Sequence, residues 1–431
     1  MKLQQLQKKL NEEELSLIAN RQGEIYTSQL HGIGPIINPM KEYLYYFEDA
    51  IVVDKVIGKA TAMLLVLSKV KYIYAYVLSE KAKEILDQYQ VDYDYEKLVP
   101  YIINRTHDGM CPMEQTVYNL TDLNEAYEAL IQKQKEMMKG DSHMKSKVFM
   151  TREITPEKVL EMYQLLGKTL TGKIAVKLHS GEAGNQNFLR PEFFKPIIDE
   201  VGGTVVECNT AYDGERNETK KHWKTIQNHR WTQYFDVDLL DEEGPDLQLD
   251  IPQGHVIHKN YVGSHLARYD SMLVLSHFKG HPMGGYGGAL KQLSIGCASS
   301  YGKAYIHGAG DPEKIWTADH DSFLESMADA AMSVHQYFQD HIVYINVMKN
   351  MSVDCDCVAD AEDPCMKDIG ILISTDPIAI DQACIDLVYQ SDDPGKEHLI
   401  ERIESRNGIH TIEAAAQLSF GSREYELIEV K

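Results

Sequence analysis

Short apolar runs alternate with amphipathic segments throughout the second half of the chain. Strands are predicted by β-branched and aliphatic runs at 147–150, 173–178, 204–208, 272–276, 342–347 and 369–374. Helices are predicted between them, at 155–167, where Thr155 is the N-cap and Pro156 the first residue, at 191–201 and at 322–339. The last of these repeats its apolar residues at i, i+4, i+7 spacing, which indicates a core face rather than a cofactor site: Phe323, Met327, Ala330, Ala331, Val334 and Phe338.

The first half shows the same alternation on a smaller scale. Residues 16–20 and 24–27 predict a hairpin, and 50–53, 72–78 and 99–103 predict strands. Asp54 is expected to cap a helix that runs to about Leu67, and Ser79 is expected to cap the next helix. The fold class is therefore α/β in two domains, a small one and a larger one with a mainly parallel sheet. Ligands on such sheets bind beyond the carboxyl ends of the strands.

A polar, glycine-containing segment at 139–146 separates these two patterns. Linkers often have this composition, so we predict domains at 1–140 and 145–431. The length of 431 residues agrees with two or three domains of ordinary size.

Charge narrows the function classes. The chain has 43 Lys and Arg against 65 Asp and Glu, a formal net charge of −22. This balance argues against a nucleic-acid partner and against an anionic membrane surface. No apolar run has the length of a membrane helix, and residues 1–11 do not resemble a signal peptide, so a cytoplasmic location is expected. The sequence allows a homo-oligomer.

Candidate chemistry gathers in loops that follow predicted strands. Lys177 and Asn209 stand at the ends of two strands, and His277, Lys279 and His281 follow a third. Four glycines at 284, 285, 287 and 288 come next, and Gly285, Gly287 and Gly288 are expected to let backbone amides approach an anion. Lys291 follows this loop. We predict a site for a small anionic molecule, with His281 or His277 transferring protons and with Lys279 and Lys291 holding the anion. A tight structural turn is the alternative for the glycines.

The cysteines suggest a second candidate site. The chain has seven of them, an odd number in a long chain, which favours reduced thiols or metal ligands over a disulfide framework. Only Cys355, Cys357 and Cys365 cluster, together with Asp354, Asp356 and Asp368. Thiolates with carboxylates suit a divalent metal or an iron–sulfur cluster, and a solvated acidic loop is the alternative. Downstream, Asp376 before Pro377 predicts an N-cap.

The larger domain resembles a known family. The segments 177–185, 206–210, 275–281, 291–296, 354–357 and 374–377 are similar to the domain of unknown function 362, often labelled an iron–sulfur centre protein. The resemblance covers nearly all of 145–431. The ferredoxin-type cysteine run that many members carry is missing here.

Residues 12–120 resemble the domain of unknown function 1893, through 32–35, 54–60 and 104–114. This resemblance implies a three-layer, cytidine deaminase-like fold. The zinc ligands of deaminases are not present, so zinc deamination is not expected. The matching segments at 54–60 and 104–114 are instead expected to bind a small ligand, through Asp54, Lys55, Lys59, Arg105, Cys111 and Glu114.

A shorter stretch is similar to the nickel-dependent lactate racemases. It contains His281, the turn at 285–288, Lys291 and His307 at comparable spacings. The resemblance implies that His281 acts as acid/base, that Lys291 tethers a pincer nucleotide, and that His307 ligates nickel. Cys355 and Cys357, with His307, are thus the predicted metal ligands.

Three functions remain open at this point. The first is a metal-assisted enzyme acting on a small anionic metabolite or a nucleotide-type cofactor. The second is an iron–sulfur or electron-transfer protein, and the third is a metabolite-sensing protein without catalysis.

Overall fold

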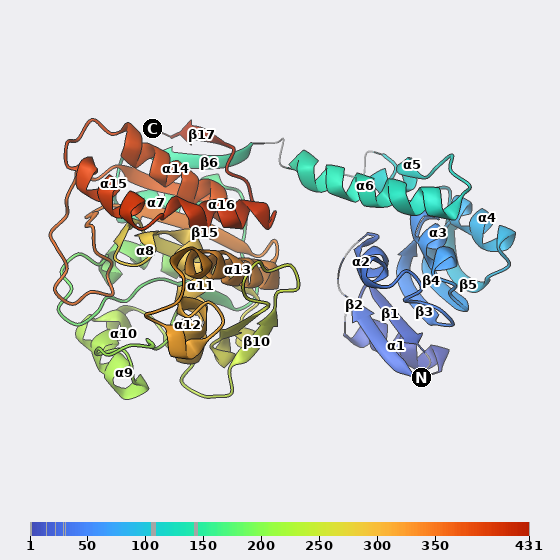
Figure 1. Ribbon diagram of the computed structural model, residues 1–431, viewed down its shortest axis with the longest axis horizontal. Helices are drawn as coiled ribbons and strands as arrows, with labels where there is room; N and C mark the ends of the chain where they lie inside the picture. The colour runs from blue at the N-terminus through green and yellow to red at the C-terminus, as the bar shows by residue number, and fades with distance from the viewer. Residues whose placement is uncertain are drawn as a thin grey trace. The chain divides into compact units, whose positions relative to one another are not determined.

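The computed structural model describes residues 2–13, 15–21, 23–28, 30, 32–104, 109–141 and 145–430. The chain divides into two compact units, Met1–Asp141 and Ser142–Lys431 (Figure 1). The predicted linker at 139–146 lies partly outside the described residues. No helix in the described ranges is long and apolar enough to cross a membrane.

The N-terminal unit is built on a five-stranded mixed sheet in the order β2-β1-β3-β4-β5. Its strands are β1 (Leu17–Arg21), β2 (Glu24–Ser28), β3 (Ile51–Ile57), β4 (Tyr72–Ser79) and β5 (Asp92–Val99). The predicted hairpin is confirmed, since β1 pairs antiparallel with β2, and β1 is also antiparallel to β3. β3, β4 and β5 are parallel.

Both faces of this sheet are covered. The helices are α1 (Leu3–Glu12), α2 (Gly34–Glu42), α3 (Lys59–Leu67), α4 (Glu80–Gln88), α5 (Pro112–Thr116) and α6 (Leu123–Asp141). Leu6 and Leu10 of α1 pack with Ile18 and Val53 on one face. The other face packs against α2 and α3 in a larger core. Ser79 caps α4 as predicted, because its hydroxyl accepts from the Ala82 amide.

Two predictions for this unit are wrong. Asp54 does not cap a helix, because β3 stays paired with β4 as far as Ile57 and keeps the chain extended. The helix therefore starts only at Lys59, after Gly58. The strand expected at 99–103 is instead β5, which ends at Val99. Its alternating tyrosines and acidic residues form a mostly exposed edge strand, a pattern without a continuous apolar run.

The C-terminal unit contains an eight-stranded sheet in the order β17-β6-β16-β15-β12-β7-β8-β9. Its strands are β6 (Ser146–Thr151), β7 (Ile174–Lys177), β8 (Thr204–Glu207), β9 (Val237–Leu239), β12 (Ser271–His277), β15 (Ile342–Met348), β16 (Gly370–Ser374) and β17 (Tyr425–Glu429). Only β16 runs antiparallel to its neighbours. The predicted α/β class and mainly parallel sheet are confirmed. Two small antiparallel pairs are added, β10 (Leu247–Asp250) with β11 (Lys259–Val262) and β13 (Lys279–His281) with β14 (Gly285–Gly287).

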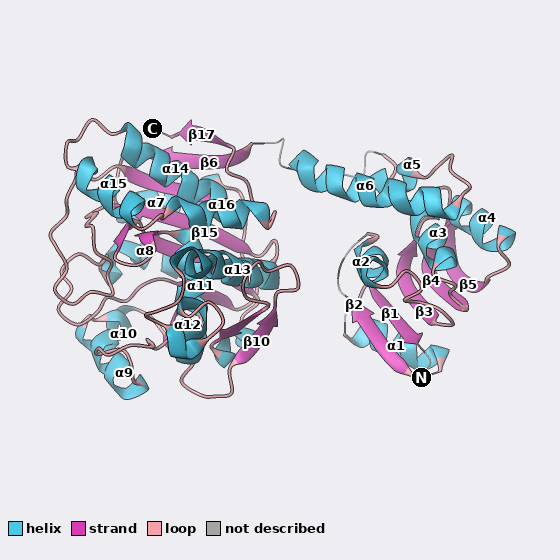
Figure 2. Cartoon of the chain, in the orientation of Figure 1, coloured by secondary structure: helices cyan, strands magenta, loops and turns pink. Residues whose placement is uncertain are grey.

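Helices cover both faces of the large sheet (Figure 2). They are α7 (Pro156–Leu165), α8 (Pro191–Val201), α9 (Thr219–Asn228), α10 (Trp231–Tyr234), α11 (Ala289–Cys297), α12 (Ser300–His307), α13 (His320–Phe338), α14 (Pro377–Gln390), α15 (Lys396–Ser405) and α16 (Ile409–Gln417), with 3-10 turns η1 (Ser264–Arg268) and η2 (Pro312–Lys314). Met272 and Val274 of β12 pack towards α11, α13 and α14, whereas Leu273 and Leu275 pack towards α7 and α8. The apolar stripe of α13 is buried, which confirms its prediction as core.

Candidate functional site

Four neighbouring parallel strands, β15, β12, β7 and β8, end at one edge of the large sheet. Lys177 ends β7, Glu207 ends β8 and His277 ends β12, while the loop after β15 carries Cys355 and Cys357. Residues distant in sequence are brought together here because the carboxyl ends of parallel strands share one edge.

A pocket lies at this edge, and we call it the cationic pocket. Five of its lining side chains are basic: Lys177, Arg216, Lys279, Lys291 and Lys303. The other lining residues are His179, Glu207, Cys208, Thr210, Tyr212, His277, Gly287, Gly288, Gln292, Ile295, Gly296 and Cys357. Among the predicted residues, the structure thus gathers Lys177, His277, Lys279, Lys291, Gly287, Gly288 and Cys357 around one space.

Three of the five cations are neutralised by buried carboxylates. Lys177 Nζ lies 2.7 Å from Glu207 Oε2. Arg216 lies 3.1 Å from Glu182 and 3.8 Å from Glu207. Lys279 Nζ lies 2.8 Å from Asp356 Oδ2. These pairs are nearly inaccessible to solvent, so each charge depends on its partner.

Lys291 and Lys303 have no such partner. Within the described ranges, no carboxylate lies at ion-pair distance from either ammonium group. Lys303 Nζ donates to the Ala298 carbonyl at 2.6 Å, and Lys291 Nζ lies 3.7 Å from Cys355 Sγ. Burial lowers the pKa of Lys303, and burial together with the neighbouring Lys279 lowers that of Lys291 well below its ordinary value. An anion bound here would supply the missing partner and favour the protonated form of both amines.

Helix α11 fixes the position of Lys291. The buried Asp381 carboxylate accepts from the Ala289 and Leu290 amides, at 2.8 and 3.0 Å, and so anchors the first turn. A β-carbon at Gly288 would overlap Asp381, which explains a glycine there. A β-carbon at Gly287 would instead meet Lys291 Cδ at 3.4 Å, so this glycine leaves room beside the lysine.

Gly285 serves packing rather than the pocket. Its φ of +78° favours glycine, and a β-carbon would meet Gly408 Cα at 2.8 Å. Gly285 and Gly288 are therefore required by packing, and Gly287 lies beside Lys291.

His277 and Lys279, two of the predicted catalytic residues, are tied to the loop after β15. His277 Nδ1 lies 2.9 Å from Asp356 Oδ1, and its Nε2 lies 2.5 Å from the Lys349 carbonyl. Since both ring nitrogens face oxygen acceptors, this ring holds the loop in place and has no free nitrogen for a substrate. Asp356, which the sequence placed in the cysteine and aspartate cluster, joins His277 to Lys279.

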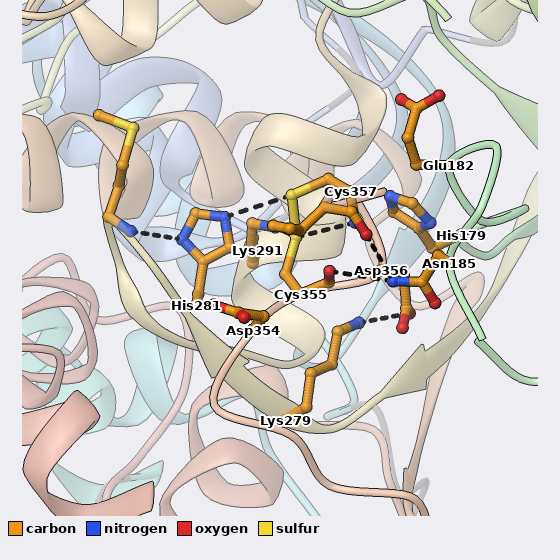
Figure 3. The surroundings of a disulfide bond; sticks show 12 residues. His179, Glu182, Asn185, Lys279, His281, Lys291, Asp354, Cys355, Asp356 and Cys357 are labelled. Atoms are coloured by element: carbon orange, nitrogen blue, oxygen red, sulfur yellow. Dashed lines mark hydrogen bonds and ion pairs between the residues drawn. A yellow bond between two sulfur atoms is a disulfide. The ribbon is translucent and has the colours of Figure 1, made fainter. Parts of the chain in front are cut away.

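His281 has a different environment (Figure 3). Its Nδ1 accepts hydrogen bonds from the Met283 and Gly284 amides, at 3.2 and 2.8 Å. The ring proton is therefore on Nε2, which lies 4.0 Å from Cys357 Sγ. Burial, followed by the charge of Lys291, lowers the pKa of His281 well below its ordinary value. The ring is a neutral Nε2–H donor facing a sulfur.

The structure joins Cys355 and Cys357 in a disulfide. Together with His281 they form the one group of three or more metal-ligating side chains found within the described ranges. This set does not fit a metal as it stands, because the sulfurs are bonded to each other and His281 Nε2 carries a proton. His307 lies outside the group, and its Nδ1 donates to the Lys303 carbonyl at 2.8 Å. The third clustered thiol, Cys365, donates to the Met351 carbonyl at 3.3 Å.

In the N-terminal unit, several of the predicted ligand-binding residues make hydrogen bonds within the unit. Lys55 is exposed beside the buried Asp54, since successive strand residues point to opposite faces. Glu114 is buried and accepts from the Lys59 amide at 3.0 Å, the Ile102 amide at 2.6 Å and the Ser79 hydroxyl. The Glu114 carboxylate is therefore occupied by hydrogen bonds within the unit.

Lys59 and Cys111 also belong to that predicted set. Lys59 Nζ donates to the Tyr118 and Leu120 carbonyls, both at 2.7 Å. Cys111 is a half-buried free thiol, and Arg105 lies outside the described residues.

The side chain of Asn209, a predicted ligand-binding residue, contacts Thr219 at 3.0 Å and His222 at 3.1 Å within the fold. Several residues that line the pocket were not predicted from the sequence. Glu207, two residues earlier and at the end of β8, was missed although its strand-end position was a usable signal. Arg216 and Lys303 have no local signal, because only the tertiary fold brings them to the pocket.

Comparison with known proteins identifies both units. Residues 5–134 match the family described as domain of unknown function DUF1893, and residues 174–386 match domain of unknown function DUF362. No curated protein matches the chain.

Similar solved structures include the following three. A DUF1893 family protein from Thermotoga maritima is 28% identical, with a TM-score of 0.29, over 30% of this chain and 88% of that one. The lactate racemase apoprotein from Thermoanaerobacterium thermosaccharolyticum is 13% identical, with a TM-score of 0.31, over 46% of this chain and 50% of that one. A further Thermotoga maritima protein is 14% identical, with a TM-score of 0.32, over 61% of this chain and 59% of that one. The chain thus spans only about half of the racemase. The family matches confirm the arrangement expected from the sequence: the protein joins a DUF1893 domain to a DUF362 domain.

Proposed function

We propose that the DUF362 domain is an enzyme that binds a small anionic substrate in the cationic pocket. The observation that carries this proposal is Lys291, a partly buried lysine in a pocket with five basic side chains, with no carboxylate at ion-pair distance in the described part of the chain. An amine held among cations without a carboxylate loses its proton more easily, so its charge calls for a partner from outside the fold. An anionic group supplies that partner.

The location of the pocket supports catalysis over storage or sensing. It lies at the carboxyl edge of a parallel sheet, and a disulfide with a neighbouring histidine forms part of its surroundings. The metal-assisted form of the earlier prediction is not part of this proposal, because the histidine and cysteines do not fit a metal in this arrangement.

Calorimetric titration with inorganic phosphate, pyrophosphate and small carboxylates tests the proposal. The intact protein should bind at least one of these anions, with an affinity that falls as salt rises. Lys291→Met should abolish binding, whereas Lys147→Met, a matched change at an exposed residue of β6, should leave it unchanged. Equal binding by both variants would refute the proposal.

A further inference from the structure

The pair Cys355–Cys357 stands apart from the other cysteines of the chain. Within the described residues it forms a disulfide, while Cys111, Cys208, Cys297, Cys365 and Cys384 are free. Burial raises the pKa of the Cys297 thiol to about 11, and it raises those of Cys208 and Cys384 well above their ordinary value. These three thiols are thus protonated and unreactive. Redox chemistry in this unit concentrates on one pair.

The two sulfurs of the pair are not equivalent. Cys357 is half-buried and lines the cationic pocket, whereas Cys355 is 1% exposed and is not among the lining residues. A nucleophile held in the pocket therefore reaches Cys357 Sγ first. Attack there makes Cys355 the leaving group.

The surroundings of Cys355 are suited to a leaving thiolate. Lys291 Nζ lies 3.7 Å from its sulfur, and the Cys357 amide donates to the same sulfur at 3.1 Å. A nearby cation and an amide donor favour the thiolate over the thiol. On the other side, the Nε2–H of His281 faces Cys357 Sγ at 4.0 Å, where it can donate a hydrogen bond to a thiolate (Figure 3).

The loop that carries the pair is fixed on both sides. Asp354 accepts from Arg402 at 3.1 Å, and Asp356 is held by His277 and Lys279. A β-carbon at Gly280 would overlap the Val353 carbonyl, so β13 lies directly against this loop. With these anchors, the two sulfurs remain adjacent whether or not they are bonded.

We propose that Cys355 and Cys357 form a dithiol–disulfide centre that exchanges two electrons with an anion-bearing thiol, or its disulfide, held in the cationic pocket. This inference rests on the proposed function and names its substrate class. It also explains why the unpaired Lys291 lies beside both the anion site and the sulfur of Cys355.

The exchange balances in two steps. A substrate thiolate attacks Cys357 Sγ, the Cys355–Cys357 bond breaks, and Cys355 leaves with the bonding pair as a thiolate beside Lys291. A second substrate thiolate attacks the substrate sulfur of the mixed disulfide, which releases the oxidised substrate and the Cys357 thiolate. The Cys357 thiolate accepts a hydrogen bond from His281 Nε2–H and takes its proton from solvent. Two substrate thiols are oxidised and one protein disulfide is reduced, and the reverse sequence reduces a substrate disulfide.

Three small thiols of similar size and different charge test the substrate class. The oxidised intact protein is treated with 3-mercaptopropionate, 2-mercaptoethanol or cysteamine at equal thiolate concentration. New protein thiols are then trapped by alkylation and located by mass spectrometry. We expect 3-mercaptopropionate to reduce Cys355–Cys357 about tenfold faster than the neutral and cationic thiols. This preference should disappear in Lys291→Met.

Control variants keep the outcome interpretable. Cys365→Ser should react as the unchanged protein does, since that thiol is not part of the pair. The double variant Cys355→Ser/Cys357→Ser should still bind phosphate or pyrophosphate, because the cations remain in place. Loss of redox exchange with retained anion binding separates this inference from the proposed function, and circular dichroism checks that each variant folds.

Three results would overturn the inference. One is equal reduction rates for the three thiols. Another is a Cys355–Cys357 pair that stays reduced after exposure to an oxidised carboxylate-bearing disulfide. The third is a stoichiometric metal bound by the pair in protein purified without oxygen.

Discussion

Replacing Asp54 with asparagine is expected to remove a pH-dependent loss of stability from the N-terminal unit. Asp54 is 6% exposed in β3, and the hydrogen bond that its carboxylate accepts comes from the Val56 amide at 2.8 Å. Burial raises the pKa of this carboxyl from 3.8 to about 7. An asparagine keeps an oxygen for the Val56 amide, so the substitution removes the ionisation and little else.

The size of the effect follows from the two pKa values of Asp54. From about pH 4 to about pH 7, the folded unit retains a proton that the unfolded chain releases, so the free energy of unfolding falls as pH rises. Each pKa unit corresponds to about 1.4 kcal/mol, and a difference of about three units gives about 4 kcal/mol. The stability of Asp54→Asn relative to the unchanged protein should therefore increase through this window and level off above it.

Urea unfolding of the full chain resolves the two units. The 3 tryptophans are Trp223, Trp231 and Trp316, all in the C-terminal unit, so fluorescence follows that unit while circular dichroism follows both. Asp54→Asn should shift only the transition that fluorescence does not see. Asp92→Asn, at an exposed residue of β5, is the matched control. A stability difference that stays constant from about pH 5 to about pH 8 would refute the reasoning.

Three further predictions concern the C-terminal unit. Because burial lowers the pKa of Lys291, the protein should take up protons when it binds an anion, and the affinity for the anion should fall as pH rises. Calorimetry in buffers of different ionisation enthalpy measures the proton uptake, and binding without it would contradict the prediction. Glu207→Leu should cost about 3–5 kcal/mol in urea unfolding because it strands the buried Lys177, and adding Lys177→Met should recover most of the loss. Gly288→Ala should lower the melting temperature, by an amount corresponding to about 1–3 kcal/mol, because the methyl group overlaps Asp381; an unchanged melting temperature would show that α11 can shift.

Local sequence patterns were enough to predict an element where its own residues stabilise it. The stripe from Phe323 to Phe338 predicted the buried face of α13, since helical periodicity alone places those side chains together. Asp376 caps α14 as predicted, accepting from the Ile378 and Ala379 amides. Strand ends could also be located, and with them the edge of the sheet where the pocket lies. Asp54 was misjudged because pairing with β4, a tertiary interaction, outweighed its tendency to cap a helix.

The sequence by itself determined the α/β class, the order of two family domains, and the loops that carry lysine, histidine and cysteine to one sheet edge. Only the tertiary structure decided what each side chain does there. Lys291 meets Cys355 across 64 positions of sequence, and Asp356 engages His277 across 79. Which ring nitrogen of His281 holds the proton depends on two amides that its own hairpin turns towards it. The charge and protonation state of a side chain depend on the groups around it in space, and the packing of the whole sheet determines which groups those are.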